Sequence, residues 1–181
     1  MIPKKLSYIK RNYHSPITNN FLTVFSTGFV LGIDDGAGPL HNATWSASTV
    51  GRTALKTFLG GGGPSGPLTA DTMDATSVSG GALTHQLAAL LLNVSFNDAN
   101  VLGGSSNVVE KFGDLHITAT STAADGLKVR DVLAQAQLFA AGHSGYSLGL
   151  SAGDLQTLVA NLNLSFDNGV ETTRASAHLI N

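Results

Sequence analysis

Residues 81–94, GALTHQLAALLLNV, constrain the fold more than any other stretch of the chain. Five leucines are spread around the turns that this segment makes as a helix, and they leave almost no polar face. A helix that is apolar on nearly all sides is stable only when other elements surround it. We therefore predict a central buried helix that begins near residues 79–80 and ends near Leu92.

Three further segments have the apolar periodicity of amphipathic helices, and each has an end signal. They are residues 48–59, 127–141 and 151–162. In the last of them Ser151 is followed at the third helical position by Asp154, which is a capping-box pattern. In the first, the expected N-cap is Ser48 or Thr49, and the expected inner face is Val50, Ala54, Leu55 and Phe58.

Two segments alternate between apolar and polar residues, as a half-buried strand does. They are residues 27–33 and 114–121, and we expect them to form one small sheet. A final edge strand is a further option for the tail, ETTRASAHLIN. The predicted fold class is α+β, mainly α-helical, with four helices and a small β-sheet. We expect residues 17–181 to form one globular domain, preceded by a basic N-terminal arm, residues 1–16.

A short motif occurs twice. LNVSFND, residues 92–98, returns as LNLSFDN, residues 162–168. Each copy follows an apolar helical segment and leads into Asn and Asp residues, which favour turns. Either the doublet is a duplicated binding site or it is one structural device used twice. We favour the second interpretation, in which both copies end a helix in the same way and pack a Leu–Phe pair, four residues apart, against the core.

The composition favours an extracellular or assembly-forming protein. Charged residues make up 12% of the chain and the net charge is only -2, whereas about 25% charged residues is typical. The polar surface must therefore come from Ser, Thr, Asn and Gly. The chain has no cysteine, which excludes disulfides, thiolate metal sites and cysteine nucleophiles.

The first 16 residues carry much of the positive charge. We expect this arm to engage a neighbouring subunit, because it has too little apolar surface to fold alone. A signal peptide is the alternative, although Thr and Gly residues interrupt its apolar part. The body is acidic, which argues against nucleic acid, and no run approaches the roughly 18 apolar residues of a membrane span. The candidate assembly residues are Lys4, Lys5, Tyr8, Lys10, Arg11 and Tyr13.

No motif predicts catalysis. The six histidines are scattered without metal-ligand spacing, and His85 is expected to be a hydrogen-bonded core or boundary residue. GHSGY has Tyr146 where a nucleophile elbow requires Gly. GGGGPSGP, residues 60–67, lacks the Lys-Ser/Thr of a phosphate loop, so we expect a flexible loop. The chain is therefore predicted not to be an enzyme.

Oxygen-rich turns give a weak calcium signal. None follows the spacing of a calcium-binding loop, and Asn and Asp are also common at helix ends. We therefore predict no cofactor, with calcium as the alternative; its candidates are Asp34, Asp35, Asp98 and Asp167. Three sequons begin at Asn42, Asn93 and Asn163, and the last two are interpreted as coincidental because they lie on helix ends.

Four sets of residues follow one another in a distinctive order: Phe58-Leu59 with Pro64 and Leu68; Gln86 through Phe96; Gly113-Asp114-Leu115; and Gly126 through Gly142. This order resembles an uncharacterised domain of bacterial secreted and cell-surface proteins, over about residues 19–170. The resemblance implies a secreted surface or matrix module and carries no catalytic residues. This chain has a basic arm and His143 where that family has a Gly/Trp-rich leader and sometimes a cysteine.

Taken together, these features predict a non-enzymatic structural subunit of an extracellular bacterial assembly, such as a filament, surface layer or matrix. The expected partners are copies of the same chain or other surface proteins, engaged partly through the N-terminal arm. Two alternatives stay open. One is a glycan- or calcium-binding surface module that uses the Asn/Asp turns, and the other is an accessory subunit of a larger hetero-complex.

Overall fold

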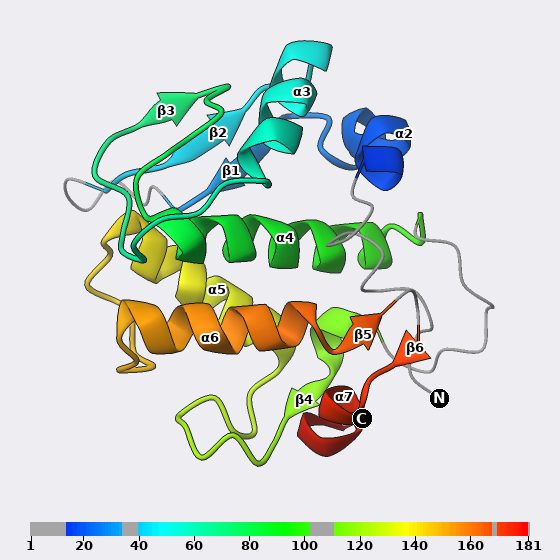
Figure 1. Cartoon of the computed structure of the whole chain (residues 1–181), viewed down its shortest axis with the longest axis vertical. Coiled ribbons are helices and arrows are strands. Elements are labelled where there is room, and N and C mark those ends of the chain that lie inside the picture. The colour runs from blue at the N-terminus through cyan, green and yellow to red at the C-terminus, as the bar shows by residue number, and fades with distance from the viewer. Residues whose placement is uncertain (1–13, 34–39, 102–110, 168–169, 181) are drawn as a thin grey trace.

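The computed structural model describes residues 14–33, 40–101, 111–167 and 170–180. Helix α4 (Gly81–Asp98) crosses the middle of the molecule, with a three-stranded sheet on one side and two helices on the other (Figure 1). Twelve of its eighteen residues are buried. The predicted central buried helix is confirmed, and it extends six residues beyond the predicted end at Leu92.

One side of α4 carries the N-terminal half of the chain. Helices α2 (His14–Val24) and α3 (Thr49–Phe58) pack there beside a sheet of order β1-β2-β3. The first two strands are antiparallel and the last two are parallel. Ser48 caps α3 by accepting a hydrogen bond from the backbone N–H of Gly51, as the sequence predicted. The strands are β1 (Phe29–Leu31), β2 (Ala43–Trp45) and β3 (Thr72–Met73).

A chain of aromatic rings fills the space between the sheet and the helices on this side. Trp45 is fully buried, with its ring centroid 5.7 Å from Phe29 and 4.8 Å from Phe58. Phe25 links this chain to α4, because its ring lies 5.7 Å from Phe96. Contacts of this length suit the edge-to-face and offset arrangements that aromatic rings prefer. These rings form the core that holds the sheet to α4.

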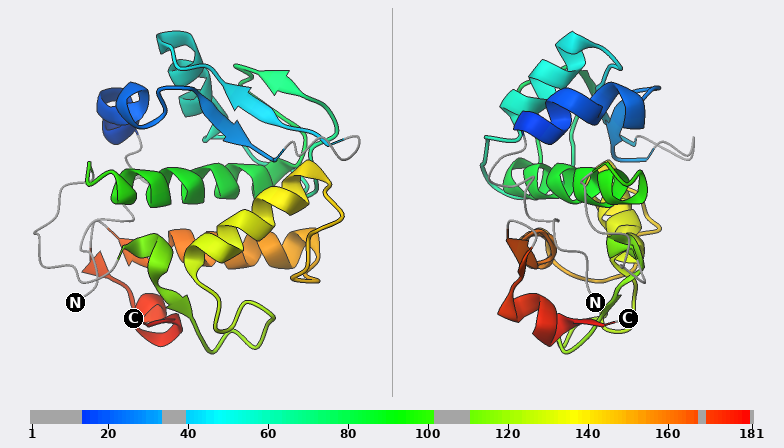
Figure 2. Two further views of the ribbon diagram at one scale, coloured as in Figure 1. Left: turned by 180° about the vertical axis from the view of Figure 1, so that it is seen from behind. Right: turned by 90° about the vertical axis from the view of Figure 1, so that its right-hand side faces the viewer.

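The other side of α4 is covered by α5 (Val129–Ala141) and α6 (Ala152–Asn163), which Figure 2 shows from behind and from the side. Ser151 caps α6 as predicted, accepting from the backbone N–H of Asp154 at 3.2 Å. Short elements lie beyond these helices. They are the 3₁₀ turn η1 (Phe112–Asp114), β4 (His116–Ile117), β5 (Phe166–Asp167), β6 (Val170–Glu171), α7 (Thr173–His178) and β7 (Leu179–Ile180).

The predicted fold class is confirmed as α+β and mainly helical, with two differences. The described residues form six helices instead of four, because α2 and α7 were not predicted. The expected single sheet is wrong: β1 pairs with β2, whereas β4 pairs with β7, the edge strand suggested for the tail. Helix α2 includes residues on both sides of the boundary proposed at residue 16, and the division into arm and domain stays a prediction.

Strand β4 is much shorter than the predicted segment 114–121 because its backbone turns sharply. Ala119 and Ser121 have φ values of 55° and 56°, in the left-handed region that disfavours continued extended structure. The carboxylate of Asp125 holds this turn by accepting hydrogen bonds from the backbone N–H groups of Thr120 and Ser121. The alternating pattern therefore predicted the strand's position but not its end.

The two copies of the doublet do not end their helices in the same way. In the first copy the helix continues through Asp98. In the second, α6 stops at Asn163, and the backbone carbonyl of Ser165 accepts hydrogen bonds from the N–H and hydroxyl of Thr172. Thr172 therefore takes the place of the donor that a further helical turn would supply to Ser165. The chain continues into the β5–β6 hairpin. The predicted matching helix ends are therefore wrong.

The doublet instead joins α4 to α6. The side-chain N–H of Asn93 donates to the amide oxygen of Asn163 at 3.0 Å, and the N–H of Asn163 donates to the backbone carbonyl of Gln86 at 2.8 Å. Asn93 is 1% exposed and Asn163 is 2% exposed. A buried polar pair needs partners in this way because an unpaired amide is costly. These asparagines serve packing, so their sequons are not accessible in the folded protein.

Candidate functional site

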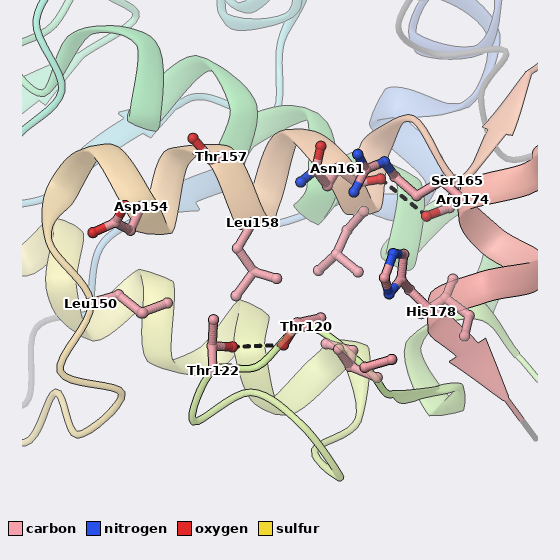
Figure 3. Close-up of a pocket in the computed structure, with 14 residues that line it drawn as sticks. Thr120, Thr122, Leu150, Asp154, Thr157, Leu158, Asn161, Ser165, Arg174 and His178 are labelled. Atoms are coloured by element: carbon pink, nitrogen blue, oxygen red, sulfur yellow. Dashed lines mark hydrogen bonds between the residues drawn. The ribbon is translucent and has the colours of Figure 1, made fainter.

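The main candidate site is a cavity of about 470 Å³ between α6, the turn after β4, and the α7–β7 segment. A volume of this size lies within the range of small-ligand pockets. Figure 3 shows the side chains that line it. The apolar lining residues are Ile117, Ala119, Leu150, Leu158, Leu162 and Leu179, and the polar ones are Thr120, Thr122, Asp154, Thr157, Asn161, Ser165, Arg174 and His178.

The polar groups are unevenly distributed along the cavity. Arg174, His178, Asn161 and Ser165 gather at the end near α7, while Asp154 lies at the other end of α6 (Figure 3). The Asp154 carboxylate is part of the N-terminal cap of α6, because it accepts a 2.7 Å hydrogen bond from the Ser151 hydroxyl. The cavity therefore has a basic end near α7. At its opposite end, the Asp154 carboxylate is hydrogen-bonded to Ser151.

Local hydrogen bonds shape the cavity walls. The Asp125 carboxylate, which holds the turn after β4, also has a lowered pKa, chiefly because the Thr120 hydroxyl donates to it. On the opposite wall the Tyr146 hydroxyl donates to the backbone carbonyl of Leu150 and accepts from its N–H, both at 3.1 Å. Burial is the main cause of the raised pKa of Tyr146. Both walls are therefore built by contacts within the chain.

The residues selected from the sequence lie elsewhere or outside the described residues. Asp34, Asp35 and all six candidate arm residues (Lys4, Lys5, Tyr8, Lys10, Arg11, Tyr13) are outside that part of the chain. Asp98 lies at the end of α4, 3.5 Å from the guanidinium of Arg130, and Asp167 lies in β5. Within the described ranges, no group of three or more His, Asp or Glu side chains is arranged to hold a metal ion.

His85 is a core residue, as predicted, but without the expected hydrogen bond at Nδ1. It is 7% exposed and its ring centroid lies 4.3 Å from that of Phe58. Nδ1 has no hydrogen-bond partner among the described residues, and burial lowers the pKa of the imidazole. Gly61 covers the ring closely, since a Cβ there would lie 2.7 Å from Nε2. The histidine packs beneath the glycine-rich loop.

The glycine-rich loop is part of the packing around α4. The backbone N–H of Ala82 donates to the carbonyl of Gly63 at 3.0 Å, and that of Gly66 donates to Gly80 at 3.3 Å. Gly81 has a φ of 51°, and a Cβ there would lie 2.1 Å from the carbonyl oxygen of Pro64. The expectation of a flexible loop did not include this packing role.

Arg130 and Asp114 form an ion pair that supports η1, and its contribution to stability depends on pH. The Arg130 guanidinium donates to both oxygens of Asp114, at 2.8 and 3.1 Å. This hydrogen bonding is the main reason that the pKa of Asp114 is lowered. Its contribution to stability is therefore present above the unfolded pKa of about 3.9 and is lost as the pH falls through the folded value.

We expect Asp114→Asn to destabilise the protein at neutral pH and to lose less further stability on acidification than the wild type. The measurement is urea unfolding at about pH 7 and about pH 3, on either side of the unfolded carboxyl pKa. Asp71→Asn is the control for an exposed carboxylate. Asp71 lies 3.6 Å from His41 and accepts from the backbone N–H of Asn42, but its side chain is 66% exposed, so these contacts contribute little to stability. An unchanged difference between the two pH values in Asp114→Asn would contradict the assigned ion pair.

Sequence reasoning missed the cavity because its residues come from distant segments. In the sequence, the polar residues Asp154, Thr157 and Asn161 have the spacing of the solvent-exposed face of an amphipathic helix. Arg174 and His178 lie in a tail that has no clear pattern. Comparisons with protein-family models, with curated proteins and with solved structures found no match. None of the described helices has the length and apolar character needed to cross a membrane.

Proposed function

We propose that the chain is a non-enzymatic structural module of an extracellular bacterial assembly, which associates with copies of itself. The low charged fraction of 12% supports this proposal, as does the resemblance to bacterial secreted and surface domains. The N-terminal arm is proposed to take part in the association.

The observation that carries the proposal is an exposed row of side chains across the three-stranded sheet. The register pairs Val30 with Thr44 and Thr44 with Met73, so the three side chains point to the same face. Val30 is 42% exposed and Met73 is 71% exposed. Both lie on strands at the edges of this sheet. Apolar side chains that gather in an exposed patch on one face of a sheet favour contact with another chain.

A second copy is the proposed occupant because the row is complementary to itself. The row has no charged member, so two such rows face each other without a desolvated charge. Thr44 has its hydroxyl bonded to Asn42 at 3.1 Å, so its contribution to the face is largely the methyl group. Symmetric pairing of one patch with itself is the commonest way in which identical chains associate.

Sedimentation velocity over rising concentrations of the full chain tests this proposal. We expect the wild type to form larger species, and Val30→Asp to raise the dissociation constant at least about tenfold, because a carboxylate in an apolar contact loses its hydration. Deleting residues 1–12, which leaves α2 intact, is expected to weaken association as well.

Leu164→Asp is the matched control. Leu164 is also an exposed apolar residue, at 45%, but it follows α6, on the opposite side of α4 from the sheet (Figure 1). It should associate like the wild type. A wild type that stays monomeric at every concentration would refute the proposal, and equal weakening by Val30→Asp and Leu164→Asp would refute the assigned surface.

A further inference from the structure

The end of the cavity near α7 presents polar groups that the fold itself does not use. Within the described residues, Arg174 has no ion-pair partner, and the side-chain amide of Asn161 makes no hydrogen bond. By contrast, the Thr120 hydroxyl contacts Thr122 at 2.7 Å, and the Thr157 hydroxyl donates to the Gly153 carbonyl. The side-chain groups that lack a hydrogen-bond or ion-pair partner among the described residues therefore lie around Arg174.

We infer that this cavity binds a small amphipathic carboxylate, with its head group on Arg174 and its apolar body against the leucines of α6. Arginine suits this head group because its planar guanidinium donates two parallel hydrogen bonds to a carboxylate. Arg174 is the one Arg or Lys among the lining residues. A single fixed positive charge matches a singly charged head better than a phosphate monoester, which carries close to two charges.

The apolar part of the ligand is defined by the middle of the cavity. Leu158 projects from α6 (Figure 3), and Leu162 of the same helix and Leu150, just before it, also line the cavity. Ile117 and Leu179 belong to the β4–β7 pair that closes the same space. Burying an aliphatic body here is favourable because it removes apolar surface of both the ligand and the leucines from water. An acetate-sized anion would leave this surface in contact with water.

His178 lines the same end of the cavity. Its Nδ1 lies 3.0 Å from the backbone carbonyl oxygen of Thr118, so Nδ1 carries the proton and donates. This fixes the neutral tautomer with an acceptor at Nε2, so the neutral ring has no donor for a carboxylate, and Arg174 carries the head-group contact. The nearby charges are those of Arg174 in the lining and Asp125, whose pKa His178 helps to lower.

The wall that faces α6 is held in an uncommon backbone conformation. Ala119 lines the cavity with a φ of 55°, a left-handed conformation that a non-glycine residue keeps only where its surroundings sustain it. The Asp125 hydrogen bonds maintain the turn. The cavity is therefore formed before any ligand arrives, which lowers the ordering cost of binding. This inference is independent of the proposed self-association.

The test is titration of the full chain with octanoate, followed by two-dimensional ¹H–¹⁵N NMR at neutral pH. Octanamide has the same body without the charge, and acetate has the head without the body. We expect octanoate to shift the resonances of cavity residues, octanamide to bind roughly tenfold more weakly, because a charge-assisted bond is lost, and acetate to bind more weakly still.

Two variants separate the head group from the body. Arg174→Gln should weaken octanoate roughly tenfold and bring it near octanamide, since only the charged interaction is removed. Thr157→Phe, on the exposed side of α6, should fill part of the cavity and weaken both ligands. Lys56→Gln is the charge-matched control, because Lys56 lies on α3, across α4 from the cavity.

The inference is overturned if octanoate shifts no cavity resonances, or if it binds wild type and Arg174→Gln equally. It is also overturned if octanamide binds as tightly as octanoate, since the arginine would then have no role. Equal weakening by Lys56→Gln and Arg174→Gln would show attraction to the overall charge of the protein, and this result would overturn the assigned head-group site.

Discussion

Replacing Trp45 with alanine is expected to lower the free energy of unfolding by about 3–5 kcal/mol, the largest effect of any single change considered. The indole is fully buried. It lies within 6 Å of the rings of Phe29 and Phe58, and its N–H donates to the carbonyl of Ala75 at 2.9 Å. The substitution removes this packing, leaves a cavity and deprives the Ala75 carbonyl of its donor.

Urea unfolding followed by far-UV circular dichroism measures this effect. Fluorescence is unsuitable, because Trp45 is the single tryptophan of the chain. Trp45→Phe should cost less than Trp45→Ala, since it keeps an aromatic ring and loses mainly the N–H donor. Val50→Ala is the control, because Val50 is 68% exposed and its truncation should change stability by at most about 0.5 kcal/mol. A loss below about 1 kcal/mol for Trp45→Ala would contradict the central place of this ring in the core.

The second large effect is expected at the asparagine pair. Asn163→Ala should destabilise the protein by about 2–4 kcal/mol, because it breaks hydrogen bonds to Gln86 and leaves the buried amide of Asn93 without its acceptor. Asn93→Ala should cost less, since the Asn93 side chain makes one of these bonds and its Oδ1 has no partner among the described residues.

A double-mutant cycle on Asn93 and Asn163 isolates their coupling. We expect an interaction energy of at least about 0.5 kcal/mol, as is usual for residues in one hydrogen-bond network. Asn161→Ala is the matched control from the same helix, because its side chain makes no hydrogen bond to a described residue. Additive effects of the two substitutions would show that the doublet does not join α4 to α6.

Much of the helical architecture could be predicted from local chemistry. The apolar segment 81–94 required packing partners on all sides. Ser48 and Ser151 cap the helices that the sequence assigned to them. These features depend on residues within one or two turns of each other, so a single sequence contains the information. The central position of α4 follows from the same reasoning.

Features that depend on distant contacts could not be predicted. Val50 was expected on the inner face of α3, but Gly51 occupies it, because a Cβ at Gly51 would lie 2.2 Å from the carbonyl oxygen of Ser46. Periodicity counts apolar side chains and does not detect a close backbone approach. The predicted partner strand of β4 was also wrong, since strand pairing between remote segments leaves no local pattern in the sequence.

The cavity illustrates the same limit for function. Its arginine and histidine come from a tail that has no motif, while its leucines belong to the ordinary apolar face of α6. Only the turn at Ala119 and the packing of α7 bring these groups together. The doublet was selected from the sequence as a possible pair of sites, and its asparagines instead form a contact within the core.

The most direct test of the account is electron microscopy of the purified full chain at high concentration, with Val30→Asp imaged in parallel. The proposed assembly predicts regularly repeating particles of identical copies for the wild type, and dispersed single copies for Val30→Asp, whose charge interrupts the row across the sheet. Uniformly dispersed single copies of the wild type, at concentrations where its fold is intact, would contradict it.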